Sequence, residues 1–191
     1  MKIDFDVDID MANREEFLRL VNHTPASIKD DNGNFTKHNT GIYLQTIPKF
    51  PLDGFSAIDY KQAEEDGWFK LDILNNHVYK DIHDEAHLNK LLDTEPMWDL
   101  LEHEEFVKLL FHIGNHYDIV KKYKPTSIEQ LSIILALIRP GKRHLVGKDW
   151  DTIKREIWLK PNDNSYYFKQ SHAVGYATVI ALQMNLLCES Q

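Results

Sequence analysis

The sequence is poor in cysteine and contains no long apolar run. Its single cysteine, Cys188, cannot form a disulfide within the chain, which excludes a disulfide-stabilised scaffold. No apolar segment approaches the roughly 20 residues that span a bilayer, so a helical membrane protein is not expected. The opening "MKIDFDVD" is charged and unlike a signal peptide. We therefore expect a cytoplasmic protein that does not enter a membrane.

Basic residues are also scarce relative to acidic ones. Lys and Arg number 22 against 30 Asp and Glu, which gives a net charge of −8. This balance would repel nucleic acid if it were spread evenly, because phosphate binding depends on Lys and Arg. Acidic residues instead gather at 4–16 and 84–105, and basic residues at 121–125 and 139–148. A polyanion could therefore bind to a locally positive surface. The composition permits such binding but does not favour it over other functions.

The chain does contain ample apolar mass and two different hydrophobic patterns. Its 191 residues, 42% of them hydrophobic, suffice for one domain or for two small lobes. Alternating polar and apolar residues predict strands in the first part, and a helical period dominates from about residue 84. We predict an α+β fold with an αβ lobe over 1–83 and an all-helical lobe over 84–191.

Local signals place the expected elements along the chain. Strands are predicted over 2–9, 40–47 and 67–75, helices over 14–21 and 59–66, and an Asn-, Asp- and Gly-rich loop over 22–39. In the second part, Thr126 and Glu129 are predicted to form the capping box of a helix that ends at Pro140 and Gly141. Ser171 is predicted to cap a final apolar helix.

Carboxylates alternate along the first predicted strand. In "KIDFDVDIDM", Asp4, Asp6 and Asp8 lie two residues apart and therefore share one face of the strand. Unpaired, such carboxylates repel one another, and a hard divalent cation relieves the repulsion. A second predicted strand, "FKLDIL", presents Lys70 and Asp72, again two residues apart. The competing interpretation is a solvated polar face on an edge strand, although Asp has poor β propensity.

These two strands would suit two-metal catalysis if they lay side by side. The D-x-D pair would hold both ions, and the third carboxylate would complete the ion that activates an attacking hydroxyl group. Lys70 would then lie beside the acids, where it could contact a phosphate. The sequence alone does not show that the strands are neighbours.

Five segments spread over nearly the whole chain carry a resemblance to one enzyme family. They are "DFDVDIDMANREEFLRLV", "KHNTGIYL", "GWFKLDILN", "YKPTSIEQLSIILALIRPG" and "YYFKQSHAVGYATVIALQMNLL". In this order they resemble the palm and fingers motifs of the C-family replicative DNA polymerases, represented by the bacterial DNA polymerase III alpha subunit. The resemblance implies a reduced nucleotidyltransferase-type palm, a mixed sheet with flanking helices, followed by reduced helical fingers.

The resemblance also implies a set of site residues. Asp4, Asp6 and Asp72 would bind two Mg²⁺ ions, or Mn²⁺, and Lys70 would be a catalytic residue near the phosphates. Residues that contact the nucleotide or the DNA would be His38, Arg139, Lys142, Arg143, Lys169, Ser171 and His172. The implied activity is Mg²⁺-dependent, DNA-directed DNA polymerisation in replication, with a DNA primer-template and deoxynucleoside triphosphates as substrates. A compact phage or plasmid replication system would suit such a chain.

Departures from the family pattern leave three alternatives open. Ile3 stands where the family has Pro, and Lys169 precedes a Gln where the family has Asn before Lys. The glycine-serine palm motif that grips the triphosphate, which the family places upstream, is missing from this sequence. The alternatives are a miniature polymerase, one piece of a split enzyme whose partner chain supplies that motif, and a catalytically inactive polymerase-like protein that binds DNA or a replisome component.

The ten histidines raise a further alternative, a zinc site. His83 and His87, like His112 and His116, are four residues apart and could share a helix face. The metalloprotease signature needs Glu directly after the first His, whereas Asp84 follows His83. We therefore do not expect a zinc hydrolase.

Overall fold

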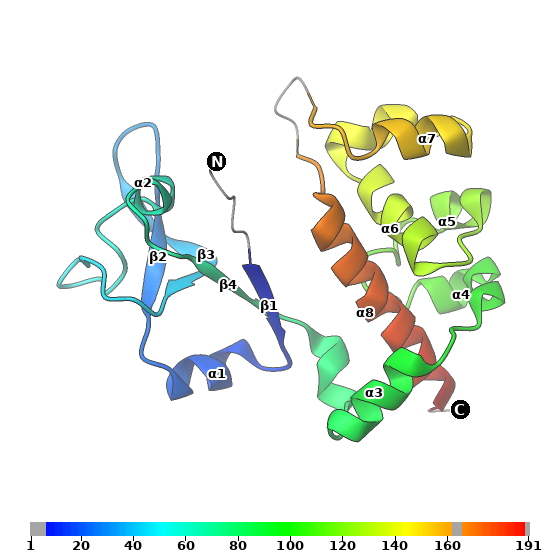
Figure 1. The fold of residues 1–191 in the computed structure, drawn as a ribbon, viewed down its shortest axis with the longest axis horizontal. Coiled ribbons are helices and arrows are strands. Elements are labelled where there is room, and N and C mark those ends of the chain that lie inside the picture. The colour runs from blue at the N-terminus through cyan, green and yellow to red at the C-terminus, as the bar shows by residue number, and fades with distance from the viewer. Residues whose placement is uncertain (1–6, 162–165, 190–191) are drawn as a thin grey trace. The chain divides into compact units, whose positions relative to one another are not determined.

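The computed structural model describes residues 7–161 and 166–189 and divides the chain into two compact units, Met1–Lys80 and Asp81–Gln191 (Figure 1). The first unit mixes helices and strands, and the regular elements described in the second are all helices. The chain is thus a mixed α and β protein, as the sequence predicts. The division falls after Lys80, whereas the sequence predicts it after residue 83. In the described ranges, no helix combines the length and apolarity needed to cross a bilayer.

The first unit is built on a four-stranded mixed sheet with the strand order β1-β4-β3-β2. β1 and β4 run parallel, whereas β4 pairs with β3, and β3 with β2, in antiparallel fashion. In chain order the elements are β1 (Val7–Met11), α1 (Arg14–Leu20), β2 (Thr24–Lys29), β3 (Phe35–Tyr43), α2 (Tyr60–Glu65) and β4 (Leu71–Asn75). β4 therefore lies inside the sheet, between β1 and β3.

The predicted loop rich in Asn, Asp and Gly is instead a β-hairpin made of β2 and β3, so that prediction is wrong. Only residues 30–34 turn. The Asp30 carboxylate accepts hydrogen bonds from the N–H groups of Asn32 at 2.9 Å and Asn34 at 2.8 Å. Gly33 takes a φ of +86°, which favours glycine. The turn has local signals, whereas the flanking strands depend on pairing between distant residues, which local propensity does not predict.

Helices α1 and α2 lie where the sequence predicts them, and each begins at a capping side chain. Asn13 accepts from the N–H of Glu16 at 3.3 Å, and Asp59 accepts from the N–H of Lys61 at 3.0 Å. Gly67, with a φ of +96°, follows the end of α2 as predicted. One hydrophobic cluster of this unit packs α2 against the sheet and contains Ala26, Tyr43, Ile47 and Ala63.

The second unit packs its helices around α6 and α8 (Figure 1). Following the 3₁₀ helix η1 (His77–Asp81), its elements are α3 (Glu85–Asp93), η2 (Trp98–Glu102), α4 (Glu104–Val107), α5 (Tyr117–Tyr123), α6 (Ile128–Leu137), η3 (Pro140–Leu145), α7 (Trp150–Glu156) and α8 (Gln170–Glu189). α6 is buried on every side from Leu131 to Leu137, as expected for a helix that is apolar all round.

The predicted capping box of α6 is displaced by one residue. The N-cap is Ser127, whose hydroxyl accepts from the N–H of Gln130 at 3.2 Å. The Gln130 side chain in turn accepts from the N–H of Thr126 at 2.9 Å. The predicted pair, Thr126 and Glu129, and the observed pair, Ser127 and Gln130, both fit the S/T-x-x-E/Q pattern. That pattern therefore locates the start of this helix to within one residue only.

Candidate functional site

The two strands that carry the predicted acidic residues lie side by side. β1 pairs with β4 in parallel, and the register sets Asp8 opposite Asp72. Because paired residues of neighbouring strands point to the same face of a sheet, these two carboxylates share a face. Asp4 and Asp6, the metal ligands that the sequence predicts on a strand over 2–9, lie outside the described residues. The juxtaposition of acidic strands that the sequence leaves open is therefore present, with Asp8 beside Asp72.

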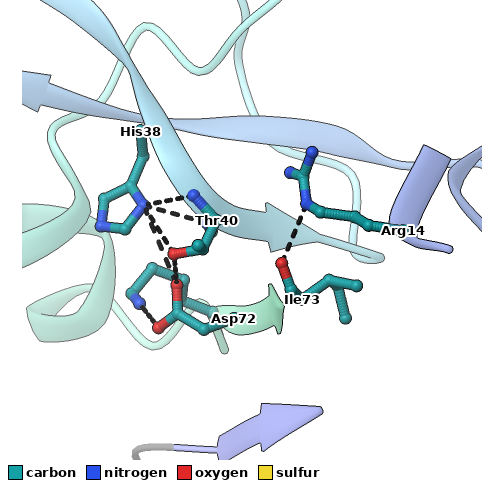
Figure 2. A network of polar contacts seen from close by, with 7 residues as sticks. Arg14, His38, Thr40, Asp72 and Ile73 are labelled. Atoms are coloured by element: carbon teal, nitrogen blue, oxygen red, sulfur yellow. Dashed lines mark hydrogen bonds and ion pairs between the residues drawn. The ribbon is translucent and has the colours of Figure 1, made fainter. Parts of the chain in front are cut away.

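Asp72 is the centre of a polar network on β3 and β4 (Figure 2). Its Oδ1 accepts from the Thr40 hydroxyl at 2.6 Å, and its Oδ2 is paired with the Lys70 ammonium. Burial raises the pKa of the Asp72 carboxyl. Hydrogen bonds from Lys70 and Thr40, together with the charge of Lys70, outweigh burial and leave the pKa below its usual range. Asp72 is therefore ionised at neutral pH, with both oxygens engaged.

His38 supports this network through the backbone of β3. Its Nδ1 accepts from the N–H groups of Gly41 at 2.9 Å and Thr40 at 3.2 Å. The same nitrogen lies 3.8 Å from Asp72 Oδ1, beyond hydrogen-bonding distance. Burial and the nearby charge of Lys70 lower the pKa of His38, and an imidazole whose Nδ1 accepts two hydrogen bonds is neutral. His38 therefore holds Thr40 in place rather than pairing with the acid.

We expect the stability of this unit to fall as the pH drops below about 6.5, the ordinary pKa of histidine. The pKa of His38 is lower in the folded chain, so the unfolded chain takes up the proton first. The contribution of His38 is complete above about pH 6.5 and is lost as the pH falls through the folded-state pKa. NMR titration of the His38 ring should give a midpoint below that of a model peptide. His38→Asn should remove this part of the pH dependence, and an unshifted midpoint would contradict the assignment.

Lys70 reaches Asp72 across Gly41 and beside an aromatic ring. β3 pairs Gly41 with Asp72, and a Cβ at Gly41 would lie 2.8 Å from Lys70 Cδ. The Lys70 ammonium lies 5.9 Å from the centre of the Tyr60 ring, a cation–π contact. The same ring meets the edge of His38 at 5.4 Å between ring centres. The position of Lys70 therefore depends on the absence of a side chain at Gly41 and on the Tyr60 ring of α2.

Thr40, Gly41 and Tyr60 belong to the site, although the sequence does not predict them there. The antiparallel pairing of β3 with β4 sets Gly41 opposite Asp72, and Thr40, the residue before Gly41, donates to the Asp72 carboxylate. Tyr60 lies near Lys70 and His38 because α2 packs onto the sheet. The glycine in "KHNTGIYL" was the one readable signal, since glycine within a strand often marks a close backbone approach.

We expect Tyr43→Phe to raise the free energy of unfolding by about 1 kcal/mol, because it removes a buried polar group that has no partner. Tyr43 is completely buried at the end of β3, and its hydroxyl finds no hydrogen-bond partner among the described residues. Burial, together with neighbouring carboxylates, raises the pKa of Tyr43 to about 12. Urea denaturation measures the change. A loss of stability in this variant would show that the hydroxyl is hydrogen-bonded in solution.

Three further hydrogen bonds connect β1 and the start of α1 to β4 and the residue after it. Arg14, the first residue of α1, donates from Nε to the Ile73 carbonyl at 2.9 Å (Figure 2) and from its backbone N–H to the Asn75 side chain at 2.7 Å. The buried Asn76 side chain donates to the Asp10 carboxylate at 3.0 Å. Asp10, the last of the alternating aspartates, therefore has a structural role.

Two of the basic residues predicted to bind phosphate differ sharply in exposure. Lys142 on η3 is only 3% exposed, and its ammonium donates to the Glu156 carbonyl at 2.7 Å. Burial lowers its pKa. Arg143, the next residue, is exposed. Lys142 therefore holds η3 against α7, whereas Arg143 is open to a partner.

Arg139 packs into an aromatic cluster. Its guanidinium carbon lies 3.7 Å from the centre of the Phe168 ring. Burial lowers the pKa of Arg139, and among the described residues its Nε and Nη2 have no hydrogen-bond partner. The His112 ring lies 4.7 Å from that of Tyr176, and burial together with the charge of Arg139 lowers the pKa of His112 to about 4. Arg139 is therefore a positioned cation whose donors are incompletely used.

The remaining predicted contact residues lie where α8 begins. Helix α8 starts at Gln170, so the predicted cap, Ser171, is wrong: this residue lies exposed in the first turn. Lys169 and His172 are half-buried beside it. These residues follow Phe168 directly, so the structure brings Arg139 close to this segment. His38, in contrast, belongs to the Asp72 network of the first unit.

The histidine pairs do not form a metal centre within the part of the chain that is described. There, no three His, Cys, Asp or Glu side chains are placed to hold a metal ion. The rings of His83 and His87 stack with their centres 4.8 Å apart, and His87 Nε2 lies 2.8 Å from the Glu189 carboxylate. This contact joins α3 to the end of α8.

Comparison with known proteins adds no assignment. No protein-family model matches the chain, and no curated protein matches its sequence. The residues of the site and their arrangement are therefore the basis for assigning a function.

Proposed function

We propose that this protein is a metal-dependent nucleotidyltransferase that extends DNA, in the manner of a reduced C-family DNA polymerase. The observation that supports this most is the pairing of β1 with β4, which sets Asp8 opposite Asp72. Lys70 contacts Asp72 on the same face. Lys70 and Asp72 are residues to which the sequence resemblance assigns catalytic roles, and the pairing supplies them with a neighbouring carboxylate.

The donor set suits a hard divalent cation. Mg²⁺ prefers carboxylate oxygens, and the register of β1 and β4 sets two carboxylates, Asp8 and Asp72, on one face of the sheet. Asp8 and Asp72 would hold the metal together with the predicted ligands Asp4 and Asp6. Bound there, Mg²⁺ would neutralise the triphosphate and activate the primer 3′ hydroxyl, and Mn²⁺ could replace it.

The chain's own residues divide the remaining work. Thr40 and Lys70 keep Asp72 ionised and oriented by donating to its two oxygens. Arg139 and Arg143 are cations that would bind the phosphates of nucleotide and DNA, as would Lys169, whereas Lys142 is left out because its ammonium is buried. Ser171 and His172 remain proposed contacts at the start of α8.

Primer extension tests the proposal directly. The full chain is incubated with a primer-template, deoxynucleoside triphosphates and Mg²⁺ or Mn²⁺, alone and with the product of any neighbouring gene. We expect extension that chelation of the metal abolishes. Failure to extend the primer under all of these conditions, combined with failure to bind Mn²⁺, would overturn the proposal.

One observation favours a second candidate, a catalytically inactive polymerase-like protein that binds DNA or a replisome component. Both oxygens of Asp72 are occupied by donors of the chain itself, which would stabilise the fold without any metal. This candidate predicts that fluorescence anisotropy detects DNA binding that is independent of divalent cations. It also predicts that primers are not extended.

A further inference from the structure

The two donors that occupy Asp72 compete with any metal ion that the proposed reaction requires. Oδ1 accepts from the Thr40 hydroxyl, and Oδ2 pairs with the Lys70 ammonium. A carboxylate oxygen can take a second partner, but an ammonium and a divalent cation on the same oxygen repel each other. A metal ion that binds Oδ2 therefore has to displace the Lys70 ammonium.

Thr40 is the donor that is held firmly. Its backbone N–H donates to His38 Nδ1, as does that of Gly41, so the imidazole braces this part of β3. The hydroxyl stands 2.6 Å from Oδ1. Its side chain is short and branched at Cβ, so few rotamers are open to it. Thr40 consequently keeps Oδ1 engaged and leaves Oδ2 as the exchangeable oxygen.

Lys70 is the donor that can move. Its ammonium ends a flexible four-carbon stem, which crosses Gly41 without a side chain to block it. The Tyr60 ring offers a second place for the ammonium, because the charge already lies 5.9 Å from the ring centre. If the Lys70 ammonium left Asp72, it would therefore still have a favourable partner, the Tyr60 ring.

Building on the proposed function, we propose that Lys70 is the resident counter-cation of Asp72 and that a divalent metal ion displaces it from Oδ2. Thr40 is the positioning residue that holds Oδ1 during the exchange. Without metal, Lys70 offsets the repulsion between Asp72 and Asp8, its neighbour on β1. With metal, the released ammonium moves toward the Tyr60 ring, where it can meet a substrate phosphate.

Lysine acylation measures the displacement without any assay of activity. The full chain is treated with an amine-reactive ester over a titration of Mn²⁺, and mass spectrometry follows each lysine. We expect Lys70 to react at least about fivefold faster at saturating Mn²⁺, because an ion-paired ammonium is protected. Lys61, whose ammonium lies 5.7 Å from the same Tyr60 ring, is the matched control and should not respond. In Asp72→Asn, Lys70 should react quickly with or without Mn²⁺.

Metal affinity provides the second measurement. Electron paramagnetic resonance of free Mn²⁺ should show about tenfold tighter binding to Lys70→Met than to the wild type, the size of effect that one nearby charge has on a carboxylate. Lys61→Met should bind like the wild type. Thr40→Val should bind about tenfold more weakly, and Thr40→Ser should restore the affinity. A purely structural role of Thr40 would change thermal stability but not this pattern.

The outcomes separate this inference from the proposed function. If the wild type binds Mn²⁺ through Asp72, while Lys70 labelling and the affinity of Lys70→Met stay unchanged, displacement is wrong and metal-dependent catalysis stands. If neither the wild type nor Lys70→Met binds Mn²⁺, both proposals are overturned. Faster Lys70 labelling on metal addition, with tighter binding by Lys70→Met, supports both.

Discussion

Asp72→Asn is expected to reduce metal-dependent primer extension by at least about 100-fold, since changes around a metal ligand typically cost 10- to 100-fold and this one alters a ligand itself. The substitution removes the negative charge of the proposed ligand. The amide keeps one oxygen to accept from Thr40, whose hydroxyl lies 2.6 Å from Oδ1 in the native chain. The loss should therefore reflect metal binding and not a disrupted sheet.

Asp53→Asn is the matched control for this variant. Asp53 is an exposed carboxylate of the same unit, so its substitution makes the same change in net charge away from the network. Extension rates by both variants are measured at several Mg²⁺ concentrations, with circular dichroism to check the fold. Extension by Asp72→Asn at the wild-type rate would refute the assigned role of Asp72.

Gly41→Ala is expected to lower the free energy of unfolding by about 2 kcal/mol, the usual cost of overpacking a tight site. An added Cβ would lie 2.8 Å from Lys70 Cδ and 3.1 Å from both the Ala26 Cβ and His38 Nδ1. Lys70 can bend away, but the Ala26 Cβ can move only with β2, and the His38 ring is held by the hydrogen bonds that it accepts from Thr40 and Gly41. The added methyl group therefore strains the sheet and pushes Lys70 from Asp72.

Gly175→Ala provides a control of opposite sign. Gly175 lies in α8, and an added Cβ would meet no atom within 4 Å. Alanine is the better helix former, so this substitution should stabilise the chain by up to about 1 kcal/mol. Chemical denaturation measures both variants under the same conditions. Equal stability of Gly41→Ala and the wild type would show that the space above Gly41 is not tightly packed.

Local patterns in the sequence predicted a substantial part of the fold. The period of apolar residues distinguishes the mixed first part from the helical second part, and the glycine at position 67 marks where α2 ends. Both signals act within a few residues of chain, so they are readable without the tertiary structure. The same short range explains the one-residue error at Ser127, where two overlapping pairs fit one pattern.

The hairpin of β2 and β3 shows where local reading fails. Residues 22–39 contain a dense cluster of turn formers, which predicts a loop, but the turn occupies only residues 30–34. The flanking strands persist because their backbone groups pair with one another and with β4. Strand preference depends strongly on such neighbours, and a propensity read along the chain does not contain them.

Some features of the candidate site are likewise predicted by local sequence, and others depend on the tertiary structure. Alternation along the strands was enough to place Lys70 and Asp72 on one face, because the side chains of a strand alternate whatever lies beside it. Which groups meet Asp72 depends on pairing between distant strands: the parallel register with β1 sets Asp8 opposite Asp72, and the antiparallel register with β3 brings Thr40 to it. Hydrogen bonds between residues more than thirty positions apart set that register, so only the folded sheet reveals a carboxylate with both oxygens occupied.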